Sequence, residues 1–367
     1  MIRKLSLFFV SILSLLVAGC GTAGTAGTAG VGTSLGGKTL SAIEPPAFVP
    51  GPLDGMATAR ARALRRPLAV ILENYAPDSR PQSGLSQAST VFETLAEGGV
   101  TRFMALYLEN DATKVGPVRS TRVYFDHWAA GFHSILAHVG GNDDAQSLLW
   151  HMSKVFNIDE NRWEINLNNT GTPLFWRSTD RVAPHNMYVN TVTLRAYADR
   201  NRQDWVYAGA SFPHKQPAPL RQRGQATTIN LGFVNPLGPL PNSDYAVRYD
   251  YDRVSNTYGR IMGGLPHVDV LNGKQIRPSN VIVMQTGPAA PDLLAGPTPE
   301  SILIPTLGSG KATIFQDGKA IDGHWQQLNQ FAPLRFSDNR WRQVALNPGQ
   351  TWVEVVPQGS SAQWVVR

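Results

Sequence analysis

Cysteine is almost absent from this chain of 367 residues, because Cys20 is the sole one. An intramolecular disulfide and a Cys-based zinc or iron–sulfur site are therefore excluded. Charged residues are also scarce, at 16% of the chain against roughly 25% in soluble domains. The formal net charge is +6, of which Arg3 and Lys4 supply two. So small and dispersed an excess argues against a nucleic acid as partner.

Long hydrophobic runs are missing as well. The longest apolar stretch at the N-terminus, residues 5–17, is interrupted by serines and is too short to span a bilayer, which takes about 20 residues. It follows two positive residues and ends in small ones, which is the pattern of a secretory signal. The sequence therefore predicts a signal peptide over residues 1–19.

The sole cysteine lies directly after this segment. Val17-Ala18-Gly19-Cys20 resembles a bacterial lipobox, in which the cysteine becomes the new N-terminus and carries acyl chains such as palmitate. Two or three acyl chains give stable anchoring, so we expect an extracytoplasmic protein anchored to the membrane through Cys20. An ordinary signal peptide with a chance cysteine, or an uncleaved anchor, is the alternative. Residues 20–60, rich in Gly, Thr and Ala and then in Pro, predict a flexible tether.

Residues 61–212 alternate between two kinds of apolar pattern. Residues 67–72, 102–108 and 133–139 are apolar runs that predict strands. Residues 85–97 predict a helix, since Leu85, Ala88, Val91, Phe92 and Leu95 recur at helical spacing. Two further helices are expected, one from Ser120 and one from Asp143 or Asp144 to about residue 155. This alternation predicts an α/β layered domain with a mixed sheet.

Helical periodicity stops after the Pro-rich stretch 213–219, so residues 213–367 predict a β-rich domain. The fold class expected for the chain is therefore α+β. The predicted strands of this second domain are 227–233, 246–251, 258–262, 281–284, 312–315 and 351–356.

Several blocks resemble one known family. They include Arg80-Pro-Gln-Ser-Gly-Leu-Ser-Gln-Ala88, Val115-Gly-Pro-Val-Arg-Ser-Thr-Arg122, Ala183-Pro-His-Asn-Met-Tyr188 and Asn347-Pro-Gly-Gln-Thr-Trp352. The set, spread over roughly residues 60–357, resembles the YerB-like bacterial lipoproteins, which combine a DUF3048 N-terminal domain with a DUF3048 C-terminal domain. The resemblance implies this domain division and an envelope location, and it implies no particular reaction.

Two acids, Glu93 and Glu97, lie four residues apart and share a face of the predicted helix. Like charges at this spacing repel by a few tenths of a kcal/mol, on the order of 0.3, so Arg102, Arg119 and Arg122 are expected to offset them. Two carboxyls with pKa values pushed apart suit acid–base chemistry on a glycan. A structural carboxylate–arginine network is the alternative.

Arg119 and Arg122 also flank the start of the second predicted helix. Free backbone N–H groups and the helix dipole favour anions there. The segment is therefore a candidate binding site for a carboxylate or phosphate, such as a peptide stem or a teichoic acid. Salt bridging, for example between Arg122 and Asp126, is the alternative.

Two loops carry histidines. His138 ends a predicted strand and is followed by Gly140, Gly141, Asn142 and Asp143, at the edge of the sheet where sites of α/β proteins gather. His185 and Asn186 form a polar loop, and His185 is a candidate acid–base partner of Glu93 or Asp143. For each histidine the alternative is a structural role. Trp163, Trp176, Trp205 and Tyr188 suggest either a sugar-stacking platform or core.

Neither a cofactor nor a metal is expected. The chain has no H-E-x-x-H, Gly140-Gly141 does not stand in a G-x-G-x-x-G frame, and Gly308-Ser-Gly310-Lys311 lacks the first glycine of a Walker motif, because position 305 is Pro. Two functions remain open. The first is an envelope lipoprotein that binds peptidoglycan, another envelope glycan or an envelope protein. The second is a peptidoglycan-cleaving enzyme, a lytic transglycosylase or hydrolase, with Glu93 as acid/base and Glu97, His138 and His185 as further candidates. A solute-binding lipoprotein fits less well, because the two predicted domains are unlike each other.

Overall fold

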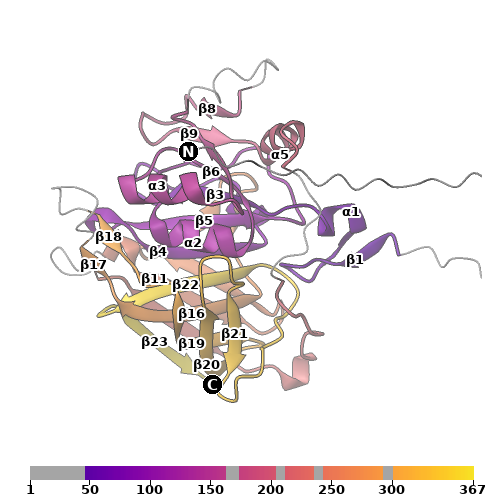
Figure 1. Cartoon of the computed structure of the whole chain (residues 1–367). Coiled ribbons are helices and arrows are strands. Elements are labelled where there is room, and N and C mark those ends of the chain that lie inside the picture. The colour runs from indigo at the N-terminus through magenta and orange to yellow at the C-terminus, as the bar shows by residue number, and fades with distance from the viewer. Residues whose placement is uncertain (1–45, 163–172, 204–210, 235–242, 292–300) are drawn as a thin grey trace, which may run out of the picture. The chain divides into compact units, whose positions relative to one another are not determined.

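The computed structural model describes residues 46–162, 173–203, 211–234, 243–291 and 301–367, which belong to one compact unit (Figure 1). The predicted signal peptide, Cys20 and most of the predicted tether lie outside the described residues. Within the described part, no helix is long and apolar enough to cross a bilayer.

A large mixed sheet of ten strands dominates the fold, as the sequence predicts in coarse outline. Four neighbouring pairs are parallel: β16 with β22, β22 with β4, β3 with β6, and β6 with β7. The remaining neighbours are antiparallel. In spatial order the strands are β21 (Arg335–Asp338), β20 (Lys319–Gln327), β19 (Gly308–Gln316), β16 (Asn280–Pro288), β22 (Thr351–Gln358), β4 (Thr90–Leu95), β5 (Thr101–Tyr107), β3 (Leu68–Glu73), β6 (Ile135–His138) and β7 (Phe156–Asp159).

This sheet runs across the boundary expected at residue 212. Strand β22, from the C-terminal half of the chain, pairs with β4 from the N-terminal half, with Thr351 opposite Thr90 and Glu354 opposite Glu93. The two halves therefore share backbone hydrogen bonds and a continuous hydrophobic core.

The helix predicted over residues 85–97 is wrong. The structure has a short 3₁₀ turn, η1 (Leu85–Gln87), then β4 and a second 3₁₀ turn, η2 (Glu97–Gly99). All six side chains of β4 are buried, so the strand lacks the polar alternation that identifies a half-buried strand, and a short apolar run of this kind matches helical spacing by chance. Its β-branched and aromatic residues favour a strand.

Two helices cover the front of the large sheet in Figure 1, α2 (Val123–Gly131) and α3 (Asp143–His151). Trp128 of α2 stacks on Phe92 of β4 with ring centroids 4.8 Å apart, which fixes the helix against the sheet. Helix α2 begins three residues after the expected Ser120, and α3 ends four residues before the expected residue 155. A third helix, α5 (Thr191–Arg200), is capped by Asn190, whose side chain accepts a hydrogen bond from the Val192 amide.

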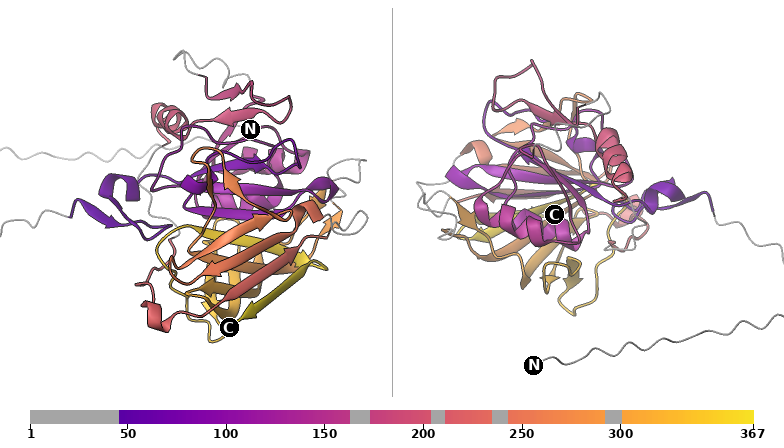
Figure 2. Two further views of the ribbon diagram at one scale, coloured as in Figure 1. Left: turned by 180° about the vertical axis from the view of Figure 1, so that it is seen from behind. Right: turned by 45° about the horizontal axis from the view of Figure 1, so that its top comes forward.

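An antiparallel sheet of five strands lies behind the large sheet, on the side away from α2 and α3 (Figure 2). Phe315 of the large sheet packs edge-on against Trp364 of this sheet, with ring centroids 5.4 Å apart. In spatial order its strands are β13 (Leu265–Pro266), β12 (Thr257–Met262), β11 (Val247–Asp252), β10 (Thr227–Gly232) and β23 (Ser361–Val366).

The last part of the predicted tether is folded. Residues 46–60 contain the hairpin β1 (Phe48–Pro50) and β2 (Ala57–Ala59), followed by α1 (Arg60–Ala63), and Leu53 between the strands is fully buried. The remaining elements are β8 (Phe175–Arg177), β9 (Met187–Val189), η3 (Leu220–Gln222), η4 (Ser243–Tyr245), β14 (Val268–Asp269), β15 (Lys274–Gln275), β17 (Ala290–Pro291) and β18 (Ile302–Leu303).

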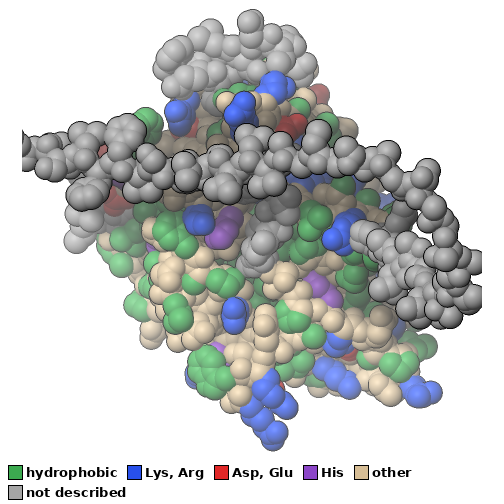
Figure 3. All heavy atoms as spheres, turned by 45° about the vertical axis from the view of Figure 1, so that its right-hand side comes forward, with side chains coloured by type: hydrophobic (Ala, Val, Ile, Leu, Met, Phe, Trp, Pro, Cys, Tyr) green, Lys and Arg blue, Asp and Glu red, His purple; other side chains and the backbone are tan. Residues whose placement is uncertain are grey.

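Positive charge is dispersed over the face of the molecule seen in Figure 3. Lys and Arg side chains alternate there with hydrophobic and uncharged ones, and few Asp or Glu side chains are visible. An anion-binding site on this face would therefore come from a local arrangement of a few side chains.

Candidate functional site

A buried carboxylate brings together two of the predicted site residues. Glu73 ends β3 and is 4% exposed. Its Oε1 accepts a hydrogen bond from Arg119 Nε at 2.8 Å, and its Oε2 lies 3.0 Å from His185 Nδ1. Glu73 is thus the partner of His185, in place of the expected Glu93 or Asp143.

The backbone around Glu73 fixes this geometry. The segment that carries Arg119 crosses the carboxyl ends of β3 and β6, because the Arg119 amide donates to Ile71 O and the Val139 amide donates to Arg119 O. The segment also binds β9, directly after the His185 loop, through the Val118 amide and Met187 O at 2.7 Å. Three segments far apart in sequence therefore converge at one edge of the sheet, where α/β proteins commonly place their sites.

The outer nitrogens of this cluster are open. Within the described ranges, Arg119 Nη1 and Nη2 and His185 Nε2 have no hydrogen-bond partner. The Arg119 side chain is 31% exposed and that of His185 17% exposed. Tyr75 stacks on the His185 ring at a centroid distance of 5.0 Å and is 42% exposed. We call Glu73, Tyr75, Arg119 and His185 the Glu73 site.

A second carboxylate–arginine network lies beside this site. Arg122 binds Glu97 through both Nε and Nη2, the latter at 2.7 Å, and Arg102 Nη2 lies 3.6 Å from Glu97 Oε2. Burial alone would raise the pKa of Glu97, but the hydrogen bonds and charges of the two arginines lower it. Burial, with the charges of Arg122 and Arg119, lowers the pKa of Arg102 to about 10.

The charges of the two groups do not cancel. Arg102, Arg119 and Arg122 are positive, and Glu73 and Glu97 are negative, which leaves one positive charge before His185 is protonated. Because the guanidinium of Arg119 still has two open nitrogens, the surplus is available to an anion at the Glu73 site. Arg102 and Arg122 are occupied by Glu97 and by backbone carbonyls of Ser120 and Thr121.

Glu93, the expected acid/base, lies elsewhere and is completely buried. Arg260 Nη2 of β12 contacts its Oε2, and the Thr101 hydroxyl donates to its Oε1 at 2.5 Å. Glu354 of β22 lies beside it in the sheet, with Oε1 3.7 Å from Arg260 Nη2 and 2.5 Å from the donating Tyr249 hydroxyl. Glu93 and Glu97 therefore do not form a carboxyl pair, and a glycan outside the protein does not reach Glu93.

Protonation keeps this buried group neutral. Burial and the charge of Glu93 raise the pKa of Glu354 well above its usual value, which favours the neutral form of Glu354. Burial opposes the charge on Arg260, but Glu93, Tyr249 and Glu354 together raise its pKa. One carboxylate then faces one guanidinium, and this pair joins the two halves of the chain.

The His138 loop is closed by its own contacts. His138 is fully buried, with Nδ1 2.7 Å from Gly140 O and Nε2 2.7 Å from Asn157 Oδ1. The Gly140 amide donates to Asp159 Oδ1, which closes the loop. The backbone and the imidazole of this loop thus bind each other.

The other predicted ligand-binding residues support local structure. Gly141 bridges to Thr121, and Asn142 donates to the Ser301 hydroxyl at 3.1 Å. Asp143 is exposed at the first turn of α3. Asn186 donates to Ser178 O and Arg181 O, which shapes the loop that presents His185.

The aromatic platform is only partly described. Trp163 and Trp205 lie outside the described residues. Trp176 stacks on Tyr188 at 6.4 Å, and Tyr188 is 2% exposed and therefore core. Among the described residues, no group of three or more His, Asp or Glu side chains is placed to hold a metal ion.

Two family models match this chain. The family model described as "Protein of unknown function (DUF3048) N-terminal domain" matches residues 53–204, and the corresponding C-terminal domain matches residues 239–353. The chain is similar to the "Putative lipoprotein YerB" of Bacillus subtilis (strain 168), with 30% identity over 321 residues, which is 85% of this chain and 87% of that protein. It is also similar to a crystal structure of the YerB protein from Bacillus subtilis, with a TM-score of 0.71 and 27% identity, covering 86% of this chain and 99% of that one.

Proposed function

Because this chain belongs to the DUF3048 family of YerB-like proteins, we propose that it is an envelope lipoprotein that binds peptidoglycan through the Glu73 site. Cys20 would carry the lipid, since it is the sole cysteine and follows a signal-like segment. The name of the Bacillus subtilis relative, a putative lipoprotein, supports the same anchor. The folded part would then be held outside the cytoplasmic membrane within reach of the wall.

The choice of ligand rests on one observation. Buried Glu73 holds Arg119 and His185 side by side, and the open nitrogens of both remain partly exposed. A guanidinium with two free nitrogens suits a carboxylate, which it binds with two parallel hydrogen bonds. Peptide stems of peptidoglycan end in carboxylates, and the stacked Tyr75 and His185 rings offer an apolar wall beside that group. The fit favours the peptide stem over an uncharged sugar.

The enzyme hypothesis loses its expected acid, since Glu93 is paired inside the protein. The Glu73–His185 pair is the remaining acid–base element, because a carboxylate on Nδ1 leaves Nε2 to exchange protons. No nucleophile with a base beside it is apparent at the Glu73 site, so binding remains the function that the site supports best.

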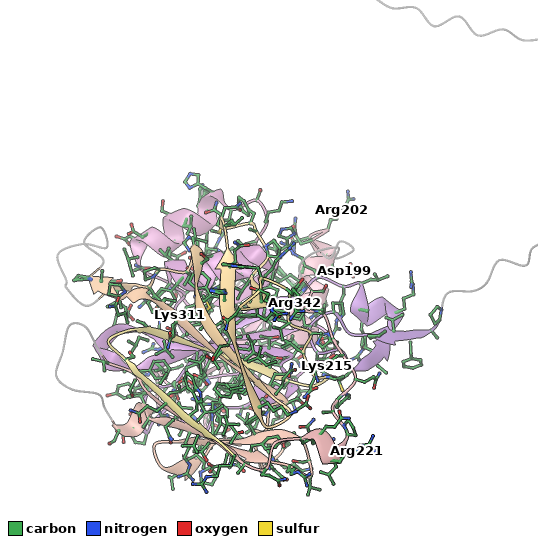
Figure 4. All side chains as sticks on the ribbon, turned by 90° about the horizontal axis from the view of Figure 1, so that it is seen from below. Asp199, Arg202, Lys215, Arg221, Lys311 and Arg342 are labelled. Carbon is green, nitrogen blue, oxygen red and sulfur yellow. The ribbon has the colours of Figure 1, made fainter. Side chains whose placement is uncertain are left out.

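The proposal is tested by co-sedimentation with purified sacculi, using the full lipidated chain in a mild detergent. Arg119→Gln keeps a donor for Glu73 but removes the charge, and we expect binding to weaken about tenfold or more. Arg202→Gln is the matched control, because Arg202 is an exposed arginine after α5 at the rim of the molecule in Figure 4.

Equal sedimentation of the Arg119 and Arg202 variants would overturn the proposal. The supernatants are analysed by mass spectrometry in the same experiment. If the unmodified chain released soluble muropeptides and the His185→Gln variant did not, the function of the Glu73–His185 pair would be catalysis rather than binding.

A further inference from the structure

A second polar surface lies on the C-terminal half, on strands β19, β20 and β21. In an antiparallel ladder, directly opposite residues point to the same side. Lys311 lies opposite His324 and Ser309 opposite Gln326, while Ser337 and Arg335 continue the two rows on β21. We call the side that these six residues share the β20 face. The intervening residues Trp325 and Phe336 are buried on the other side, 2% exposed each.

A half-exposed tryptophan is held over this face. Trp341 stacks on His324 with ring centroids 4.3 Å apart and an interplanar angle of 8°, yet it is 56% exposed. Its φ of 60° is left-handed, a conformation that costs energy in a bulky residue. Asp338 Oδ1 keeps the turn in place by accepting hydrogen bonds from the amides of Arg340 and Arg342. One ring face of Trp341 is therefore covered and the other is presented to solvent.

Uncompensated positive charge borders the tryptophan. Within the described part of the chain, neither Lys311 nor Arg335 has an ion pair or a side-chain hydrogen bond. Arg342, by contrast, is neutralised by Asp338 at 2.6 Å. Asp322 lies two residues from His324 along β20, opposite Thr313, and accepts a hydrogen bond from the Thr313 hydroxyl. Figure 4 labels Lys311 and Arg342 on the side of the molecule seen from below.

A hollow continues from this face. Ser309 and Lys311 also line a cavity of about 570 Å³ at the carboxyl ends of β16 and β22, as the described residues form it. This is within the range of roughly 300–1,000 Å³ for ligand pockets. Its other walls include Thr286, Gln358 and Ser360, which offer hydroxyl and amide groups, and the apolar Trp325, Val356 and Pro357. Gly310 also lines the cavity and lets Trp325 pack directly on the backbone, because a Cβ there would lie 2.5 Å from Trp325 Nε1.

We propose that the β20 face and this cavity bind an acidic glycan, a chain of sugar rings that carry carboxylate or phosphate groups. Trp341 stacks on one ring, as aromatic rings do on the C–H faces of sugars. Lys311 and Arg335 pair with the anionic groups, and the hydroxyl and amide side chains of the cavity bind ring hydroxyls. An uncharged glycan would leave both cations unused, and an anion without rings would leave Trp341 exposed. The inference does not depend on the Glu73 site.

The test measures binding of defined probes to the full lipidated chain in detergent, by titration calorimetry. The probes are an oligogalacturonate, a glucosylated poly(glycerol phosphate), a neutral maltooligosaccharide of matched length and poly-γ-glutamate, which has charge but no rings. We expect the two acidic glycans to bind about tenfold or more tightly than the other two. Whichever of the two binds more tightly identifies the anion.

Variants assign the binding to this face. Trp341→Ala and Lys311→Gln should each weaken acidic-glycan binding about tenfold, and Trp341→Phe should restore part of it. Arg221→Gln, which removes an exposed charge in η3 (Figure 4), should leave it unchanged. The inference would be overturned if poly-γ-glutamate bound as tightly as the acidic glycans. It would also be overturned if neither Trp341→Phe nor Lys311→Gln changed acidic-glycan binding, and these two variants keep the test valid even if Trp341→Ala failed to fold.

Discussion

The buried Glu93–Arg260–Glu354 group shows how one residue's charge decides its role. All three side chains are fully buried, and burial together with the charge of Glu93 raises the pKa of Glu354 and favours its neutral form. The charged pair is therefore Glu93 with Arg260, and Glu354 acts as a neutral hydrogen-bonding group. Removing one partner of a buried ion pair leaves the other charge unpaired, which costs about 3–5 kcal/mol.

Two substitutions that look alike should therefore behave differently. Glu93→Gln leaves Arg260 without its carboxylate, and we expect the free energy of unfolding to fall by about 3 kcal/mol or more. Glu354→Gln replaces a neutral carboxyl by a neutral amide of the same shape, and we expect a loss of about 1 kcal/mol or less. Urea denaturation at pH 7 compares them, and equal losses would contradict this assignment of the charges.

At the scale of the elements, the hairpin of β1 and β2 contains Asp54, a carboxyl group whose pKa is strongly raised. Asp54 is buried beside Glu109, and burial, with the charge of Glu109, raises the pKa of Asp54 from 3.8 to about 7. Glu109 accepts hydrogen bonds from the Leu53 amide and the Ser89 hydroxyl, which tie the hairpin to the body. The folded state therefore holds a proton on Asp54 that the unfolded chain releases near pH 4.

The sign of the pH dependence follows from this proton. Between about pH 4 and pH 7 the folded state binds more protons than the unfolded state, so this group makes stability fall as pH rises, with no further change above about pH 7. Asp54→Asn keeps the acceptor for the Met56 amide. We expect the variant to be more stable at pH 8 by on the order of 1–2 kcal/mol.

Thermal or urea denaturation at pH 5 and at pH 8 checks the Asp54 prediction. The gain should shrink at pH 5, where Asp54 of the unmodified chain is already protonated in the folded state. A gain of the same size at both pH values would show that charge on Asp54 is not its cause.

The elements also show what sequence patterns can predict here. Strand β3 was predictable because a short apolar run ends at a polar turn, and this places Glu73 at a strand end. Strand β4 was not, because a strand buried on both faces has no alternation to distinguish it from a helix. The contact of Glu73 with His185 spans 112 residues, and no local pattern encodes such a pairing.

At the scale of the whole molecule, the two halves are joined more closely than their separate sequence patterns suggest. Strand β22 pairs with β4 across more than half of the chain, and Arg260 reaches Glu93 across the same junction. The division at residue 212 stays a prediction about how the chain is organised. The mixed sheet itself followed from the alternation of apolar runs, whereas its continuity depended on long-range pairing that such runs do not specify.

The proposed lipid anchor on Cys20 concerns the whole molecule, because it would decide where the folded part can act. Only Cys20 can carry thioether-linked acyl chains, so Cys20→Ser should abolish lipidation while leaving the fold of residues 46–367 unchanged. Acyl chains contribute about 0.8 kcal/mol of membrane-binding free energy per buried CH₂. Within the described part, no helix is long and apolar enough to cross a bilayer.

The prediction is checked by detergent phase separation. We expect the unmodified chain in the detergent phase, and the Cys20→Ser chain mostly in the aqueous phase or still joined to its signal segment. Mass spectrometry of the N-terminal peptide separates these two forms, and an unmodified Cys20 in the mature wild-type chain would refute the anchor.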